Sequence, residues 1–124
     1  MINIYIIENK GYAIRQTTNG RGYTMINQYF EEIQIGDRSV SRARTVTEAD
    51  IVNFSGLTGD WYPLHTDVEY AKNTPFKQRI AHGMLVLSIA TGLTRLEPGF
   101  LVAFYGMDRV RFINPTFIGD TIHV

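Results

Sequence analysis

The chain has 124 residues, a length that suits one domain with a single hydrophobic core. Its 12 basic side chains balance 12 acidic ones, so no excess charge recruits nucleic acid or an anionic membrane. It contains no cysteine, which excludes disulfides, thiol catalysis and cysteine-ligated zinc. No segment approaches the roughly 20 apolar residues of a membrane span. These features favour a cytoplasmic protein with no membrane or nucleic-acid partner.

The first 24 residues carry none of the patterns found later in the chain. They end in the turn-rich run Asn19-Gly20-Arg21-Gly22, shortly before a second methionine, Met25. We therefore predict an N-terminal extension over residues 1–24, whose native origin is open, and one domain over residues 25–124.

Two elements are predicted between the extension and the middle of the chain. Polar and β-branched residues over 38–46 predict a strand, and residues 47–55 predict a short helix. Thr47 would be the N-cap of this helix, Asp50 its capping-box partner and Gly56 its stop. The helix would turn three apolar side chains inward: Ile51, Val52 and Phe54.

The next segment, residues 59–67, reads Gly-Asp-Trp-Tyr-Pro-Leu-His-Thr-Asp and is the most informative part of the chain. Asp60 and His65 lie close together across a proline, so a short rigid turn can aim both side chains at one point. A carboxylate beside an imidazole is a proton-handling pair, and the segment therefore predicts an active-site loop. A second short helix over 67–73 follows and ends before Pro75.

A longer helix is predicted over residues 82–96, which carry no charge from Gly83 to Thr94. Its apolar character on most sides predicts a buried helix about 22 Å long, which suits the curve of a sheet. The start of the helix offers free backbone N–H groups at its positive end, and Gly83 lets a ligand oxygen approach them closely.

The last third of the chain predicts strands over 101–113 and 116–124. Val110 and Phe112 alternate with two arginines, as expected of a half-buried strand. The final residues, 121–124, look like the start of a strand, so the sheet is expected to be incomplete at the C-terminus. Either the chain is truncated, which we favour, or a partner covers the exposed edge.

Several separated motifs together resemble those of the MaoC-like acyl dehydratases, a family that includes the R-specific enoyl-CoA hydratases (hydratase 2 motif). The resemblance covers residues 28–124, and it is carried by the 59–67 segment, Glu69-Tyr70-Ala71, Ala81-His82-Gly83-Met84-Leu85 and Pro115-Thr116-Phe117-Ile118-Gly119-Asp120. It implies an α+β hot-dog fold, in which a curved antiparallel sheet wraps around the helix over 82–96. One departure is Tyr62, which stands where many members carry Asn, and which alters the mouth of the expected pocket.

The resemblance implies an (R)-specific enoyl-CoA hydratase, or 3-hydroxyacyl-CoA dehydratase, acting on an acyl-CoA thioester. Asp60 and His65 would hold one water between them, with Asp60 favoured as the base and His65 as its proton partner. The N–H of Gly83 would stabilise the enolate charge on the thioester oxygen. Coenzyme A belongs to the substrate, so we expect no separate cofactor and no metal.

Five further residues are predicted to bind the substrate. Trp61 and Tyr62 would form the wall of the pocket, and His82 would lie at the start of the central helix. Thr91 matches a hydroxyl residue that lines the acyl pocket in the resembled family, although a threonine on a buried helix more often bonds a carbonyl one turn back. Arg109 would meet the phosphates of coenzyme A, although solvated surface charge is its ordinary role.

Three alternatives to the hydratase stay open. A non-catalytic acyl-CoA binder or regulatory subunit would keep the pocket without turnover. A hot-dog thioesterase would direct water to the carbonyl carbon instead of Cβ. A metal site is the third, since Asp60, His65, Asp67 and His82 could supply N and O ligands, but these residues lack the usual helical spacing of two histidines.

We also expect the domain to form a homodimer or a higher homo-oligomer through its sheet. Relatives with a hot-dog fold usually pair in this way, and a small curved sheet around one helix leaves apolar edge surface.

Overall fold

The computed structural model describes most of the chain from Val40 onward and short parts before it, namely residues 5–7, 25–26, 29–32, 34–35, 40–96, 98–99 and 102–124. Most of the predicted extension over 1–24 and parts of the predicted strands over 38–46 and 101–113 lie outside these residues. The boundary between extension and domain at residue 25 therefore stays a prediction.

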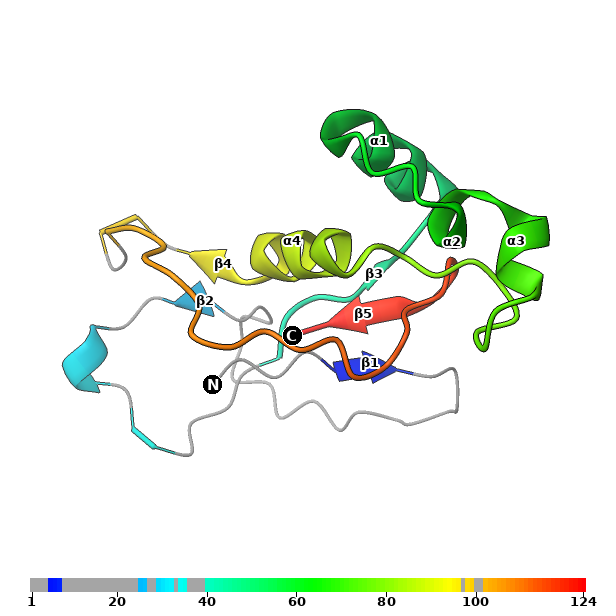
Figure 1. The fold of residues 1–124 in the computed structure, drawn as a ribbon. Coiled ribbons are helices and arrows are strands. Elements are labelled where there is room, and N and C mark those ends of the chain that lie inside the picture. The colour runs from blue at the N-terminus through cyan, green and yellow to red at the C-terminus, as the bar shows by residue number, and fades with distance from the viewer. Residues whose placement is uncertain are drawn as a thin grey trace.

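The α-helices lie in the middle of the sequence, with strands before and after them (Figure 1). In chain order the elements are β1 (Tyr5–Ile7), β2 (Met25–Ile26), the 3-10 helix η1 (Phe30–Glu32), β3 (Arg44–Thr45), α1 (Glu48–Thr58), α2 (Pro63–Thr66), α3 (Val68–Lys72), α4 (Gly83–Leu93), β4 (Arg95–Leu96) and β5 (Thr121–His123).

The main sheet is antiparallel and has β5 at its centre, between β1 and β3. Ile122 of β5 is paired with Ile6 on one side and with Arg44 on the other. Backbone hydrogen bonds continue the β3–β5 pairing beyond the strands, since Val46 N–H donates to the Asp120 carbonyl at 2.8 Å and Gly119 N–H donates to the Val46 carbonyl at 2.8 Å. A second, parallel pair joins β2 to β4.

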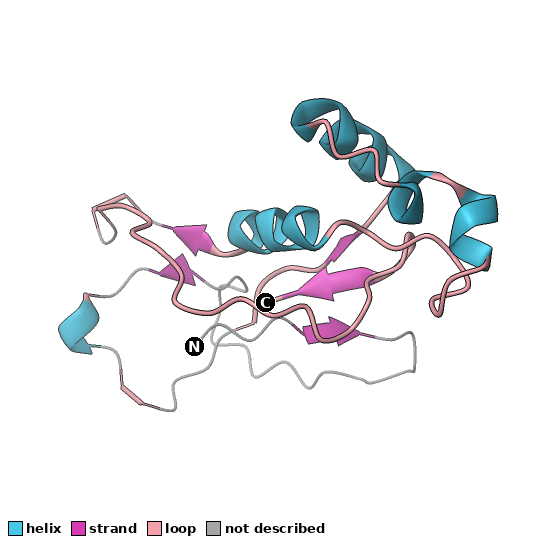
Figure 2. Ribbon diagram, in the orientation of Figure 1, coloured by secondary structure: helices cyan, strands magenta, loops and turns pink. Residues whose placement is uncertain are grey.

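Helix α4 packs on the main sheet, as Figures 1 and 2 show, and the core lies between them. The core joins one face of α4 to β5, to the residue after β3 and to α1. Its buried members are Val46, Ile51, Ala81, Leu85, Val86, Ile89, Leu93 and Ile122. An antiparallel sheet with a helix against it is the expected arrangement, although α4 is not buried all round. Met84 is 56% exposed, because the sheet covers only one side of the helix.

Helix α1 begins as predicted but ends later. Thr47 caps it, and the reciprocal bonds between Thr47 and Asp50 form the expected capping box. Gly56 does not stop the helix, because the chain leaves it only at Gly59, whose φ of 77° is the left-handed conformation that favours glycine. The predicted inner face is corrected too, since Ile51 is buried but Val52 is 49% exposed.

The strand predicted over 101–113 is wrong for the residues that the structure describes. Residues 102–113 form no ladder with any described strand, and their side chains are exposed. Alternation of apolar and charged residues favours a strand only when a neighbouring strand accepts its backbone hydrogen bonds. In the described part of the chain, an isolated bridge joins Ile80 to Phe117, beyond this segment.

The remaining elements differ from expectation by their lengths. The helix predicted over 82–96 spans Gly83–Leu93, and the strand predicted over 116–124 is confined to Thr121–His123. Among the described residues, no helix is both long enough and apolar enough to cross a membrane.

Candidate active site

The end of helix α1 places Asp60 on a short, hydrogen-bonded turn. Gly59 N–H closes the helix by donating to the Ser55 carbonyl at 2.8 Å. The N–H of Asp60 then donates to the Thr58 hydroxyl at 3.2 Å, and its carboxylate accepts the Tyr62 N–H at 3.2 Å. These bonds fix the backbone on both sides of an exposed carboxylate.

His65 lies on α2, a one-turn helix that the sequence did not predict. Pro63 begins this helix, where its fixed φ and missing N–H are tolerated. The side chain of His65 donates from Nδ1 to the Ile80 carbonyl at 2.7 Å. Because a carbonyl can only accept, the proton lies on Nδ1. The other nitrogen, Nε2, is therefore the atom that exchanges protons in the neutral ring.

His82, the residue before α4, lies directly against His65. The two imidazole rings have centroids 3.9 Å apart and an angle of 33° between their planes. His82 is only 2% exposed, and its Nε2 lies 3.1 Å from the Asp60 carbonyl and 3.3 Å from the Ser55 hydroxyl. Burial lowers the pKa of His82, and the charge of neighbouring His65 lowers it further. The lowered pKa favours the neutral form of His82.

The side chains of Asp60, His65 and His82 converge, with one N or O atom of each within 4.8 Å of the others. They are graded in burial, since the carboxylate is exposed, His65 half-buried and His82 buried. Such a group could hold a metal by its donor set. However, the two imidazole rings lie face to face, with centroids 3.9 Å apart and 33° between their planes, and rings in this relation do not readily direct two in-plane lone pairs at one ion. The arrangement suits proton transfer through His65 better than coordination by both rings.

Gly83 begins α4 beside this cluster and faces the ring of Phe112. A Cβ at Gly83 would lie 2.8 Å from two carbons of that ring, so no larger residue fits without movement. The first backbone bond into the helix runs from Val86 N–H to the His82 carbonyl at 3.1 Å. The N–H groups before Val86 have no partner within the helix, which makes this end a potential site for a negatively charged oxygen.

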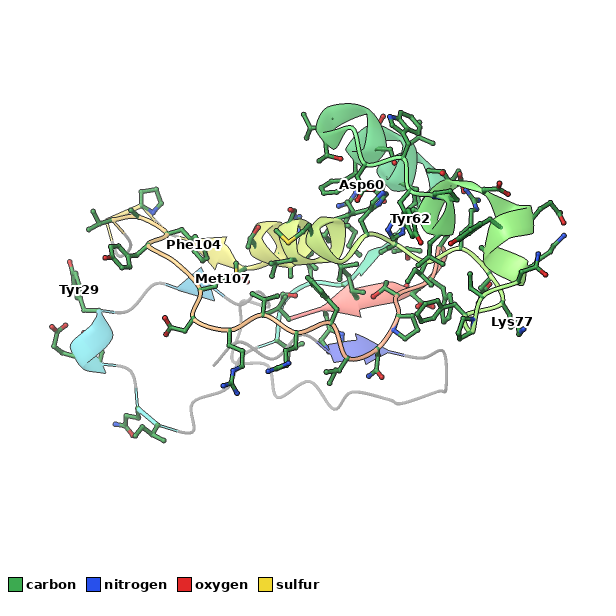
Figure 3. The ribbon with its side chains drawn as sticks, viewed as in Figure 1. Tyr29, Asp60, Tyr62, Lys77, Phe104 and Met107 are labelled. Atoms are coloured by element: carbon green, nitrogen blue, oxygen red, sulfur yellow. The ribbon has the colours of Figure 1, made fainter. Side chains whose placement is uncertain are left out.

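Two tyrosines lie beside the cluster and are half-exposed. The hydroxyls of Tyr62 and Tyr70 are 3.0 Å apart, and this hydrogen bond raises the pKa of Tyr70. The ring of Tyr62 meets His65 edge-on at 6.2 Å. Asp60 and Tyr62 lie near the start of α4, whereas Phe104 and Met107 lie on the chain that passes β4 (Figure 3).

The other predicted binding residues are more scattered. Trp61 is 54% exposed on the same loop as Asp60. The Thr91 hydroxyl donates to the Ser88 carbonyl at 2.7 Å, a local bond within α4. Arg109 is exposed on the segment after β4. Within the described part of the chain, no hydrogen bond or ion pair joins Thr91 or Arg109 to the cluster, and their binding roles stay predictions.

Two contributors to the site were missed by sequence reasoning. Ser55 is fully buried against His82, and the Ile80 carbonyl holds His65. Ser55 follows Ile51 by four residues, which places both on one helical face, so the helix period could have indicated it. No sequence pattern points to a backbone carbonyl fifteen residues from the histidine it binds.

The comparisons with known proteins identify the family. Residues 32–124 match the family described as MaoC like domain, and the chain belongs to it. A relative from Rhodospirillum rubrum, named (R)-specific enoyl-CoA hydratase, is 44% identical and aligns with 79% of this chain and 67% of its own length.

Solved structures give the same result for the fold. The structure of a protein named monoamine oxidase regulatory protein, from Archaeoglobus fulgius, is 52% identical, covers 77% of this chain and 67% of its own, and has a TM-score of 0.70. The MaoC-like dehydratase from Rhodospirillum rubrum is 29% identical over 77% of this chain and 66% of its own, with a TM-score of 0.67. These likenesses confirm the predicted α+β hot-dog fold.

The chain spans only part of its relatives. It covers 29%, 67% and 60% of the length of three curated proteins that it matches. Names in the family include hydratases and dehydratases, which supports lyase-type activity for the family as a whole.

Proposed function

We propose that the protein containing this chain is an (R)-specific enoyl-CoA hydratase, or 3-hydroxyacyl-CoA dehydratase, that adds water to a trans-2-enoyl-CoA. The observation that carries the proposal is the convergence of Asp60 and His65 beside the first turn of α4. This arrangement combines a proton acceptor, a second proton-exchanging group and free backbone N–H donors. The names of relatives, among them an (R)-specific enoyl-CoA hydratase, supply the reaction and its stereochemistry.

The start of α4 is suited to bind the thioester carbonyl oxygen of the substrate. During hydration, negative charge develops on the thioester oxygen as water attacks Cβ. A backbone N–H at Gly83, at the positive end of a helix, stabilises that charge more than it stabilises the neutral carbonyl. Glycine places no side chain of its own over this N–H, whereas a side chain at that position would meet Phe112.

Asp60 and His65 would hold the water, accept one of its protons and return one proton to the substrate. The water oxygen bonds to Cβ as one of its protons passes to the pair, with Asp60 as the base. The pair then returns one proton to Cα, through Nε2 of His65, so that it ends in its starting ionisation state. One water is consumed, the C=C double bond becomes a single bond, and no electron acceptor is required. The step therefore calls for neither a metal nor a redox cofactor.

A regulatory, non-catalytic acyl-CoA binder is the second candidate. The specific observation in its favour is that the 52% identical protein of known structure is named a regulatory protein. Such a protein would keep the acyl-CoA contacts but would not need two proton-exchanging side chains placed together.

One assay separates these functions and the thioesterase. Crotonyl-CoA is incubated with the protein while the absorbance of the conjugated double bond and the release of free thiol are followed in parallel. Hydration removes the double bond and releases no thiol, whereas a thioesterase releases thiol. We expect the first result. Binding of crotonyl-CoA with neither signal would support the regulatory binder instead.

A further inference from the structure

We propose that His82 and Ser55 are positioning residues, which hold the backbone carbonyl of Asp60 and so fix where its carboxylate lies. This inference rests on the proposed hydration, because it assigns to the two residues a role in the placement of the base. It also reassigns His82, which the sequence predicted to bind the substrate directly.

The hydrogen bonds of His82 determine which of its nitrogens carries the proton. Nε2 lies 3.1 Å from the Asp60 carbonyl oxygen, which has only lone pairs to offer. Nε2 must therefore carry the hydrogen and donate it. Nδ1 is then the bare nitrogen, and it is buried with no hydrogen-bond partner among the described residues. The ring therefore acts as a donor towards the Asp60 backbone.

Ser55 completes the anchor from the last turn of α1. Its hydroxyl is 3.3 Å from Nε2 and it is fully buried, so the serine and the Asp60 carbonyl share the one N–H of His82. The ring is also confined by its neighbours. Phe54 lies on one side with ring centroids 5.0 Å apart, and His65 stacks at 3.9 Å. An imidazole held by two rings and two oxygens cannot rotate without breaking these contacts.

The burial of His82 separates its role from that of His65. At 2% exposure it has almost no surface to offer a substrate, whereas His65 is half-buried and Asp60 is exposed. The anchor joins the end of α1 to the start of α4, since Ser55 belongs to the first and His82 immediately precedes the second. The anchor therefore fixes the position of the base relative to the proposed oxyanion site.

Two variants of the full chain test the anchor. His82→Gln places an amide N–H close to the position of Nε2 and keeps the donor, whereas His82→Phe keeps a ring of similar shape and removes the donor. Loss of positioning of the base by an ångström costs about 10²-fold in rate. We expect His82→Phe to lower kcat on crotonyl-CoA by about that factor with KM nearly unchanged, and His82→Gln to restore most of it.

Ser55→Ala serves as the milder variant, since the carbonyl of Asp60 still keeps its donor. Its kcat is expected to lie between those of the wild type and His82→Phe. Equal losses in His82→Gln and His82→Phe would overturn the anchor, because a purely structural role of the ring does not distinguish a donor from its absence. A rise in KM at constant kcat would also overturn it, in favour of direct substrate contact.

An activity-independent measurement keeps the anchor separate from the proposed reaction. Imidazole ¹⁵N spectra of the wild type are expected to show His82 neutral with its proton on Nε2. The His82→Phe spectrum should then show a shifted Asp60 amide signal, and His82→Gln should show a smaller shift. A proton on Nδ1 of His82 would overturn the anchor even if crotonyl-CoA is hydrated. Absence of hydration with the expected spectra would overturn the reaction and leave the anchor supported.

Discussion

Gly83 and Phe112 lie so close together that the absence of a side chain at Gly83 is a steric requirement. A Cβ there would be 2.8 Å from two ring carbons of Phe112 and 2.9 Å from a third. Phe112 belongs to the exposed segment after β4, so a distant part of the chain covers the start of α4.

The first prediction follows from this contact. Gly83→Ala should destabilise the protein by about 1–3 kcal/mol, the usual cost of overpacking, and should lower turnover because α4 or Phe112 must move. Urea denaturation gives the free energy of unfolding. Gly83→Ala combined with Phe112→Ala is the matched control and should recover most of that loss. A Gly83→Ala protein as stable as the wild type would show that the ring moves freely away.

The second prediction concerns the two proton-exchanging residues. Asp60→Asn and His65→Gln keep size and much of the hydrogen bonding but remove proton transfer. Each should lower turnover of a trans-2-enoyl-CoA by about 10²- to 10⁴-fold, the range of general acid–base groups. The double variant should lose little more activity than the less active of the two single variants, because the effects of groups that act as a unit are not additive. Hydration kinetics, with circular dichroism as the fold control, would measure this. Full activity in folded Asp60→Asn would remove the mechanism.

The third prediction uses the lowered pKa of His82. Burial is the largest influence on this pKa and lowers it below its ordinary 6.5, and the charge of His65 adds to this effect against the opposing hydrogen bond to the Asp60 carbonyl. Between the folded and unfolded pKa values the unfolded chain binds more protons, so the free energy of unfolding rises with pH in that window. We expect stability to fall as the pH decreases below 6.5 and to level off, for this group, below the folded pKa. Denaturation across a pH series would show it, and the slope should be weaker in His82→Gln.

The fourth prediction concerns residues 1–24. The sequence predicts that removing them leaves the fold nearly unchanged. Strand β1 pairs with β5 over three residue positions, so the structure predicts a loss instead. Hydrogen bonds of this kind contribute about 1 kcal/mol each, and we expect the deletion to cost roughly 1–3 kcal/mol. Ile6→Pro, which removes one strand N–H, is the local control. Unchanged stability in both would support the boundary at residue 25.

The fifth prediction concerns self-association, which the sequence led us to expect. The segment after β4 exposes several large apolar side chains, among them Val102 and Tyr105, each at 104%, and Ile113 at 84%. Such surface favours contact with another molecule. Light scattering should give a mass of at least twice that of the chain, and Tyr105→Ser should weaken the association. A monomer at all concentrations tried would contradict the expected dimer.

Local signals in the sequence predicted the parts of the fold that depend on near neighbours. The capping box of Thr47 and Asp50 marked the start of α1 correctly, because both partners lie within one turn. Its end was missed, because Gly56 is tolerated inside a helix and only the left-handed conformation of Gly59 stops it. The strand expected over 101–113 failed for a related reason, since its alternation carries no information about which strand it would join.

In the candidate site, too, local relationships were predicted from the sequence and contacts between distant elements were not. The proximity of Asp60 and His65 followed from their spacing on one loop, and the structure brings them together. The partners that orient them come from other elements: Ser55 from α1, Ile80 from the chain before α4 and His82 from the start of α4. Their contacts depend on how the helices pack, which a single sequence does not specify.

The backbone of Ile80 links His65 to the chain that leads into α4. Its N–H donates to the Leu64 carbonyl at 3.4 Å, and its carbonyl accepts a hydrogen bond from the His65 imidazole at 2.7 Å. Both backbone polar groups of Ile80 are therefore bonded to α2. The next residue, Ala81, donates to the Thr116 carbonyl at 2.7 Å. A shift of the backbone at Thr116 would therefore move His65 and the start of α4 together. The distance between the His65 ring and the start of α4 would then change little, because both are attached to the same two residues, Ile80 and Ala81.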